Sequence, residues 1–310
     1  MTDDLIICTR NRASDLARCL ASVLAQTRVP TCTTVVDSSD DDASKAVVDD
    51  FATRWPSAHA LTHVRSEPGL VRQRLVGFDN TREPIVHFVD DDTVLEPGYI
   101  EGIVATFDED AQQQLGGVGG FVIDQPEHRY RRIDEVLGLD SRREGVVLPS
   151  GRNVRIHTEP RTDIDVDWLS GCAMSYRRSA LARNPLQPER VGRDRNGEDV
   201  QLSYRVRQHA RLVVTPRARL AHITSDAGRP SVERLTTTEL VSRWERVDAR
   251  TGDLSKRAFW VSAVGQLTWY GAKAAVTLSR ERFGIAKATW RGIGEIRRAR
   301  RVRRRERAGS

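Results

Sequence analysis

The sequence contains few cysteines and no long hydrophobic run. Its four cysteines are scattered through 310 residues and show neither a paired framework nor a C-x-x-C metal spacing, so a disulfide scaffold is disfavoured and a reducing compartment fits best. The opening MTDDLIICTRNR carries acids where a signal peptide needs basic residues. The uncharged stretch AFWVSAVGQLTWYGA near the C-terminus is shorter than the roughly 20 residues of a membrane span. We therefore expect a cytoplasmic protein without a transmembrane helix.

Positive charge is concentrated at the C-terminus. The formal net charge is +6, but residues 297–307 hold eight arginines and one glutamate, which leaves −1 for the rest of the chain. Trp260, Trp269 and Tyr270 precede this run, and the combination favours a helix that lies on an anionic membrane surface. The alternative is a helix packed on the domain with a solvated basic end. Nucleic acid is a less suitable partner, because the tail lacks interleaved aromatic residues for base stacking.

The first hundred residues alternate short β-branched runs with amphipathic stretches, which is typical of βαβ units and a mainly parallel sheet. We expect Ser14 to be the N-cap of the first helix. The expected strands cover residues 5–8, 33–36, 60–64 and 85–89, and the expected helices cover residues 14–26, 43–55 and 70–81. The less regular middle part predicts a helix that begins near Glu198 and strands at 118–123, 168–176, 212–215 and 220–223. In open sheets of this kind, ligands bind beyond the carboxyl ends of the strands.

Three adjacent acids follow the fourth expected strand in IVHFVDDDTVLEPGYI, residues 85–100. Their mutual repulsion has to be offset by a cation or a proton, and carboxylate oxygens are ligands that suit Mg²⁺ or Mn²⁺. A diphosphate would supply the remaining ligands. The D-x-D-x-T motif of aspartate-nucleophile phosphatases does not fit, because Val94 stands where its threonine belongs. Solvated turn acids are the remaining alternative.

Several motifs follow one another along the chain: LIICTRNR, TVVDSSDDDAS, GLVRQRLVGFD, FVDDDTVLEPGYI, DVDWLSGCAMSYRRSAL and NGEDVQLSYRVRQHARLVVTP. Together, over about residues 4 to 230, they resemble glycosyltransferase family 2, whose members are nucleotide-sugar-dependent enzymes of the GT-A fold. The resemblance implies an α/β protein with a Rossmann-like, mainly parallel central sheet flanked by helices. Cys8 and Arg10 depart from the proline and tyrosine that are usual in the family.

The resemblance also implies roles for individual residues. On the donor side, it implies that the nucleotide sugar is bound by Thr9, Asn11, Arg12, Asp37, Arg72, Arg74, Asp90 and Asp91. It implies that Asp92 binds the metal that bridges the diphosphate, with His222 as a further ligand. Plainer interpretations remain open, namely an Asx turn at Asp37, an exposed helix position for the arginines, and a core or surface position for the histidine.

On the acceptor side, the resemblance implies that Trp168 and Gly171 shape the sugar pocket. It further implies that Asp199 is the catalytic base and that Glu198 is its neighbour or orienting partner. An acceptor hydroxyl has a pKa far above neutral, so its attack on the anomeric carbon needs a positioned carboxylate. The alternatives are a packing tryptophan in a buried strand and acids that stabilise a helix N-terminus.

These features predict a metal-dependent inverting glycosyltransferase. We expect a catalytic domain over residues 1–235, with a nucleotide-binding half at 1–115 and an acceptor-binding half at 116–235, followed by a basic helical extension at 236–310. LVSRW lacks the glutamine of processive synthases, because Leu240 replaces it, which favours single transfer. We expect a glycan or lipid-linked acceptor in cell-envelope assembly and a peripheral position at the inner face of the cell membrane. The alternatives are a non-enzymatic binder of phosphate, membrane or nucleic acid that uses the arginine-rich tail and, less favoured, an aspartate-dependent phosphatase.

Overall fold

The structure is a computed structural model that describes residues 1–124, 128–185, 197–223, 231–249 and 252–308. The chain divides into two compact units. The sheet unit comprises Met1–Glu127, Ile156–Arg193 and Asp199–Ser225, and the helical unit comprises His128–Arg155, Asp194–Glu198 and Asp226–Ser310. The division expected at residue 235 stays a prediction, which limited proteolysis can test.

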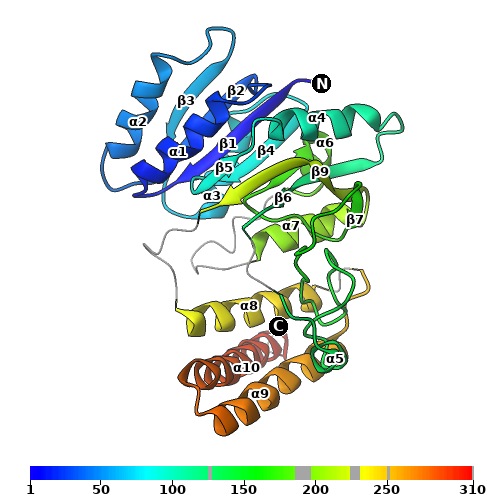
Figure 1. Cartoon of the computed structure of the whole chain (residues 1–310). Coiled ribbons are helices and arrows are strands. Elements are labelled where there is room, and N and C mark those ends of the chain that lie inside the picture. Colours follow the sequence, from blue (N-terminus) through cyan, green and yellow to red (C-terminus); the bar gives the residue numbers. More distant parts are fainter. Residues whose placement is uncertain (125–127, 186–196, 224–230, 250–251, 309–310) are drawn as a thin grey trace. The chain divides into compact units, whose positions relative to one another are not determined.

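A mixed sheet forms the centre of the sheet unit (Figure 1). Its described strands follow the order β3-β2-β1-β4-β8-β6-β9-β5, with β7 paired to β9. The first half is parallel and consists of β1 (Asp3–Thr9), β2 (Cys32–Asp37), β3 (Ala60–Arg65) and β4 (Ile85–Asp90). The second half adds antiparallel pairs to the parallel β6–β9 pair and consists of β5 (Thr93–Leu95), β6 (Leu115–Val122), β7 (Ile164–Val166), β8 (Met174–Arg177) and β9 (Arg211–His222).

Helices cover both faces of this sheet. Leu5 and Ile7 of β1 point into one core, where they pack with α1 (Ala13–Leu24), α2 (Ala43–Ala52) and α4 (Tyr99–Glu109). Ile6 points into the other core, which is covered by α3 (Leu70–Asp79), α6 (Arg178–Arg183) and α7 (Glu198–Arg207). Because side chains alternate along a strand, a strand buried on both faces must be apolar throughout. The continuous apolar run in LIIC meets this requirement.

Three predicted elements differ from the structure. The helix α1 begins at Ala13, so Ser14 is not its N-cap. The strand expected over residues 168–176 is interrupted by a turn, in which the Ala173 amide donates to the Ser170 carbonyl, and only its last part forms β8. The strands expected at 212–215 and 220–223 form one continuous strand, β9. Pro216 does not interrupt it, because it lies where the register with β6 shifts and no hydrogen bond to β6 is needed.

The helical unit contains α5 (Arg132–Val136), α8 (Val232–Asp248), α9 (Lys256–Thr277) and α10 (Arg280–Ala308). The three longer helices share a core of Leu240, Trp244, Val247, Phe259, Ala263, Ile293 and Ile296. Trp260, expected as an interfacial aromatic, packs against this core, with its ring 5.5 Å from Trp244 and 5.3 Å from Phe259. Among the described helices, none combines the length and the apolar character needed to cross a bilayer.

Candidate active site

The carboxyl ends of the parallel strands bring polar residues to one edge of the sheet. Thr9 at the end of β1 lies opposite Asp37 at the end of β2. Cys8 of β1 lies opposite Asp90 at the end of β4. Open α/β sheets bind their ligands at this edge. The register therefore gathers residues from three sequence regions at a position suited to ligand binding.

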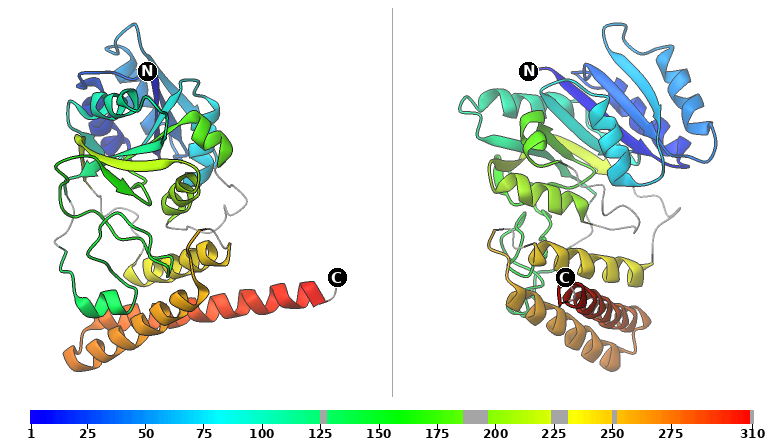
Figure 2. Two further views of the ribbon diagram at one scale, coloured as in Figure 1. Left: turned by 90° about the vertical axis from the view of Figure 1, so that its right-hand side faces the viewer. Right: turned by 180° about the vertical axis from the view of Figure 1, so that it is seen from behind.

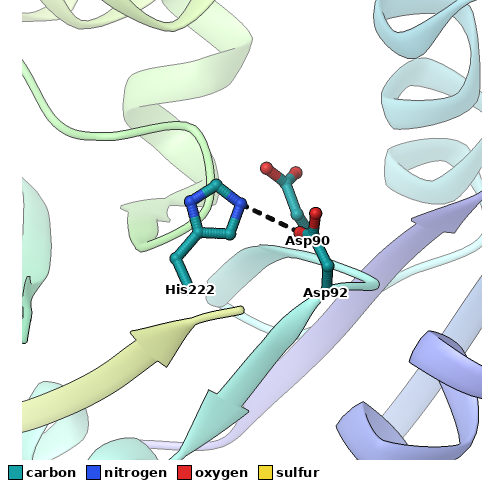
Figure 3. Close-up of side chains that lie close together, drawn as sticks. All are labelled: Asp90, Asp92 and His222. Atoms are coloured by element: carbon teal, nitrogen blue, oxygen red, sulfur yellow. Dashed lines mark hydrogen bonds and ion pairs between the residues drawn. The ribbon is translucent and has the colours of Figure 1, made fainter. Parts of the chain in front are cut away.

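The acid stretch at residues 90–92 runs from the last residue of β4 to the start of β5, close to the end of β9 (Figure 3). The pairing of β5 with β9 places Thr93 opposite His222, and His222 Nε2 lies 2.9 Å from Asp92 Oδ1. Asp90, Asp92 and His222 each offer one ligand atom, and these three atoms lie within 4.8 Å of one another. Carboxylate oxygens suit Mg²⁺ and Mn²⁺, and imidazole is compatible with Mn²⁺. The donor set therefore fits the expected ion.

Arg12 partly neutralises this acid stretch, and Thr9 stabilises it through a hydrogen bond. Arg12 Nη1 lies 3.3 Å from Asp91 Oδ1 and 3.0 Å from Asp92 Oδ2. The Thr9 hydroxyl donates to Asp91 Oδ2 at 2.7 Å. Burial nevertheless raises the pKa of Asp91 to about 7, against the opposing effects of Thr9 and Arg12. Ionisation of Asp91 is thus costly, and the site favours additional positive charge.

Asp92 and His222 stabilise each other's charged forms. Burial alone would raise the pKa of Asp92, but the hydrogen bond and charge of His222, together with Arg12, lower it. The hydrogen bond to Asp92 raises the pKa of His222 to about 10, and Cys172 adds to the rise. An imidazole that ligates a metal is neutral. A bound cation at this place would therefore substitute for the proton of His222.

A second set of contacts connects Asp90 to Asp199. The buried Arg74 on α3 lies 3.4 Å from Asp90 Oδ1, and its guanidinium donates to the Gly171 carbonyl at 3.1 Å. The Gly171 amide donates to Asp199 Oδ2 at 3.0 Å. A Cβ at position 171 would come within 3.0 Å of the Arg74 guanidinium and 3.4 Å of Asp199. A side chain there would require the Arg74 guanidinium to shift by a few tenths of an ångström, whereas its contact with Asp199 would be of ordinary length.

The turns after β1 and β2 hold each other in place. Asn11 has a left-handed backbone with a φ of 54°, and its amide donates to Ser39 Oγ at 2.8 Å. Its side chain exchanges two hydrogen bonds with Asp40. The buried carboxylate of Asp37 accepts hydrogen bonds from the Ser39 amide and from Arg65. Asp37 therefore makes the Asx turn of the plainer interpretation, and its contact with a nucleotide base stays a prediction.

The remaining candidates lie in different environments. Arg72 is exposed on α3, whereas Arg74 is buried. Trp168 is buried just before the turn that contains Gly171. Glu198 is the first residue of α7 and belongs to the helical unit. The functional roles of these residues stay predictions.

Three further residues near this edge were not anticipated from the sequence. Gln73 is buried, and its side-chain amide donates to backbone carbonyls of β1 and β2, both at 2.9 Å. Arg65 lies 3.0 Å from Asp37, and Cys172 contributes to the raised pKa of His222. Gln73 is a polar residue within the predicted helix at residues 70–81, and nothing in its local sequence indicated that it would be buried. The other two depend on contacts between residues that are distant in the sequence.

The fold is that of nucleotide-sugar glycosyltransferases of the GT-A type. The model of glycosyl transferase family 2 matches residues 4–183, which is more than half of the chain. The chain belongs to this family. The expected family, fold class and enzyme class are therefore confirmed, and the alternatives of a phosphatase and of a non-enzymatic binding protein are set aside.

Individual relatives are glycosyltransferases as well. A glucosyl-dolichyl phosphate glucuronosyltransferase of Haloferax volcanii is 27% identical over 159 residues, which are 49% of this chain and 50% of that protein. The match thus spans about half the length of this relative. A mannosyltransferase of Pyrobaculum calidifontis, solved with GDP-Man and Mn²⁺, has a TM-score of 0.59 at 17% identity over 94% of this chain and 84% of that chain.

A second solved structure, GalNAc-T7 with UDP, GalNAc and Mn²⁺, has a TM-score of 0.58 at 16% identity. It covers 86% of this chain and 54% of that chain. At such low identities, a structural similarity establishes a shared fold, while donor and acceptor depend on the residues of the site.

Proposed function

We propose that this protein is a metal-dependent inverting glycosyltransferase that moves a sugar from a nucleoside diphosphate sugar to an acceptor hydroxyl. The observation that carries this proposal is the convergence of Asp90, Asp92 and His222 within 4.8 Å at the sheet edge. Asp199 is linked to the same edge through both backbone polar groups of Gly171. Candidate cation ligands and a candidate base thus lie around one site.

Asp92 and His222, with Asp90 beside them, would hold Mg²⁺ or Mn²⁺. The ion, when bound, would stabilise the charge that develops on the departing diphosphate. Arg12 holds the acid stretch through its ion pairs with Asp91 and Asp92, and guanidinium groups also suit phosphate oxygens. The Mn²⁺ present in both solved relatives supports this assignment.

Asp199 is the proposed general base. Its Oδ2 accepts a hydrogen bond from the Gly171 amide, and its Oδ1 accepts one from the Val200 amide at 2.7 Å, so the carboxylate is held at the start of α7. The acceptor oxygen attacks the anomeric carbon while Asp199 takes the hydroxyl proton. The bond from this carbon to the diphosphate oxygen breaks in the same step. A single displacement inverts the configuration at the anomeric carbon. Glu198 is the proposed orienting neighbour.

The nucleotide is proposed to lie over the ends of β1, β2 and α3, where Thr9, Asn11 and Asp37 are the candidate contacts. The exposed Arg72 is a further candidate for a phosphate oxygen. The solved relatives contain GDP-Man and UDP, so guanine and uracil are the two bases to test first.

A lipid-linked or other envelope glycan is the proposed acceptor class. The name of the Haloferax volcanii relative contains a dolichyl phosphate, which is a lipid carrier. The arginines at 297–307 support contact with an anionic membrane surface at the cytoplasmic face. Trp168 and Gly171 are the proposed acceptor-side positions.

A thermal-shift panel tests the donor and the metal together. A ligand that binds only the folded state raises the melting temperature. We expect GDP or UDP to raise it in the presence of Mn²⁺ or Mg²⁺ and to have little effect without the ion. If no nucleoside diphosphate gives a metal-dependent shift, the proposed function is wrong.

Asp199→Asn tests the mechanism. We expect kcat for sugar transfer to fall about 10²–10⁴-fold, because the proton acceptor is lost, while the metal-dependent thermal shift remains. Asp165→Asn is a matched control, because Asp165 is an exposed strand carboxylate paired with Arg211 on the surface. NMR of the product should show an inverted anomeric configuration. A retained configuration, or an unchanged kcat for Asp199→Asn, contradicts the mechanism.

A further inference from the structure

Exposed apolar side chains are concentrated in the helical unit. Among the described residues, thirteen large apolar side chains are exposed, and ten of them belong to this unit. Charge is distributed just as unevenly. Over the whole sequence, the helical unit has 28 basic and 15 acidic residues, a net charge of +13, whereas the sheet unit has a net charge of −7. A surface that is both apolar and basic is typical of proteins that bind anionic bilayers.

The two most exposed of these side chains, Leu278 and Val276, lie at the turn between α9 and α10, which forms one end of the helical unit (Figure 2). We call residues 275–283 the hairpin tip. Within it, Val276, Leu278 and Phe283 are 84%, 88% and 64% exposed. Its charged residues are Arg280, Arg282 and a single acid, Glu281, and Lys273 precedes it on α9. The tip thus has three exposed apolar side chains with nearby basic residues.

Leu278 is the most informative residue of the tip. It caps the C-terminus of α9 in a left-handed conformation, with a φ of 50° and a ψ of 29°. Helices usually place glycine at such a position, because a Cβ is disfavoured there. A leucine that is 88% exposed gains almost no packing within the chain that could offset this cost. A partner that buries the side chain would account for its presence.

We propose that the hairpin tip inserts Val276, Leu278 and Phe283 into the interface of an anionic lipid bilayer, while the neighbouring basic residues contact lipid phosphates. This inference rests on the membrane contact proposed above, and it adds an apolar anchor at the end of α10 opposite to the arginine tail. A second copy that docked by the same tip is a poorer partner, because two helical units of net charge +13 would then face each other and repel. A phosphate polymer offers no apolar phase for the three side chains.

Leu278→Gly separates bilayer docking from folding stability. Glycine removes the apolar side chain and adopts the left-handed conformation more easily, so the melting temperature should stay the same or rise. The full-length protein should partition about tenfold less into phosphatidylcholine vesicles with about 30% phosphatidylglycerol, and about a hundredfold less when Phe283→Ser is added. Leu278→Asn is a second variant that tolerates the same backbone. Unchanged partition of the double variant overturns the proposal.

Val261→Ser combined with Val264→Ser is the matched control. These valines are 59% and 50% exposed on the same helix, but they lie roughly 18 to 23 Å from Val276 along α9, at a rise of about 1.5 Å per residue. Their replacement should leave the partition within about twofold, because they lie outside the inserted part. An equal loss in both double variants would mean that the whole helix face binds, which contradicts insertion by the tip.

Salt distinguishes the tip from the arginine tail. Contacts between exposed charges are screened at roughly 0.5 M salt, so deletion of residues 297–310 should lower the partition only at low salt. The effect of Leu278→Gly should persist at high salt, and its disappearance there counts against an apolar anchor. Neutral phosphatidylcholine vesicles should bind the protein more weakly than anionic ones, and equal binding contradicts the charge complementarity.

Two further measurements test whether a second copy of the chain covers the hairpin tip and separate bilayer docking from the proposed sugar transfer. If Leu278→Gly changes the oligomeric state in size-exclusion chromatography without changing the partition, a second copy covers the tip and the bilayer proposal is wrong. The metal-dependent thermal shift with nucleoside diphosphates should be the same in all tip variants. A failure of bilayer docking can therefore be told apart from a failure of the proposed sugar transfer.

Discussion

Two stretches of three consecutive aspartates follow parallel strands of this protein, residues 40–42 after β2 and residues 90–92 after β4. The side chains of Asp40 and Asp42 are 72% and 82% exposed. Those of Asp91 and Asp92 are 5% and 7% exposed. Three aspartates near the carboxyl end of a parallel strand thus have two very different environments. The first stretch begins three residues after Asp37, the last residue of β2, and leads into a helix, whereas the second begins with the last residue of β4 and leads into a strand.

A helix begins directly after residues 40–42. Ala43 starts α2, and its amide donates to Asp41 Oδ1 at 3.1 Å. Asp42 pairs with Arg65 at the surface, and water solvates the exposed oxygens. Helix N-termini favour negative charge, because their backbone N–H groups are unsatisfied. These carboxylates are therefore stabilised without an ion.

A strand comes directly after residues 90–92 instead. The pairing of β5 with β9 brings His222 to Asp92. Asp91 and Asp92 are buried, and the Asp90 side chain is partly exposed. A charge away from water is expensive unless an opposite charge lies close to it, and Arg12 supplies only part of the compensation. Acids at a strand end therefore favour a cation site when the next element buries them. Adjacency in the sequence is not sufficient.

The largest difference between the two stretches is expected in ion-dependent ligand binding. Asp92→Asn replaces a charged candidate ligand that lies beside His222. We expect the Mn²⁺-dependent affinity for a nucleoside diphosphate to fall at least about a hundredfold, because even groups that only support a ligand contribute about 10 to 100-fold. Isothermal titration calorimetry with and without Mn²⁺ measures this. The melting temperature without nucleotide controls for folding, and an affinity close to that of the wild type would remove Asp92 from the metal site.

The strands that build this edge were predictable from local sequence, whereas the contact with His222 was not. The runs LIIC in β1 and IVHFV in β4 are buried along their whole length. Both are apolar except for His87, and such runs favour central strands. The approach of His222 depends on the pairing of residues 93–95 with residues 220–222. No local pattern encodes a contact over this separation, and only the family resemblance pointed to this histidine.

The errors in the predicted elements arise from competition between local propensity and tertiary contacts. Ser14 has the side chain of an N-cap, but α1 begins one residue earlier, next to Arg12, whose guanidinium pairs with the acid stretch. The residues from 168 to 176 read as one strand, but the chain turns at Gly171, where Arg74 and Asp199 both bind its backbone. In both places, the contacts of the candidate site decide the local structure.

The histidine next to the second stretch should make stability depend on pH. In EDTA, the pKa of His222 is about 10 in the folded protein and about 6.5 in the unfolded protein. Protonated His222 therefore stabilises the fold fully below about pH 6.5, and this stabilisation is lost as the pH rises toward 10. His222→Gln keeps a donor for Asp92 but does not titrate. The wild type should therefore lose stability relative to this variant as the pH rises through this range. The difference between their free energies of unfolding should fall on the order of 2 kcal/mol.

Urea unfolding at about pH 6 and about pH 9.5 measures this difference. The Asp92→Asn variant serves as the control, since it lacks the carboxylate whose hydrogen bond and charge raise the pKa of His222. Parallel pH profiles for the wild type and His222→Gln would show that the pair does not contribute to stability.

The smallest effect is expected for the exposed stretch, in the double variant Asp41→Asn with Asp42→Asn. Asparagine can accept the Ala43 amide as aspartate does, and the surface ion pair of Asp42 with Arg65 contributes little. Sugar transfer should stay within about twofold and the free energy of unfolding within about 0.5 kcal/mol. Kinetics and urea unfolding measure both. A loss of Mn²⁺-dependent nucleotide binding comparable to that of Asp92→Asn would mean that burial does not separate the two stretches, because the exposed acids would then bind the ion as well.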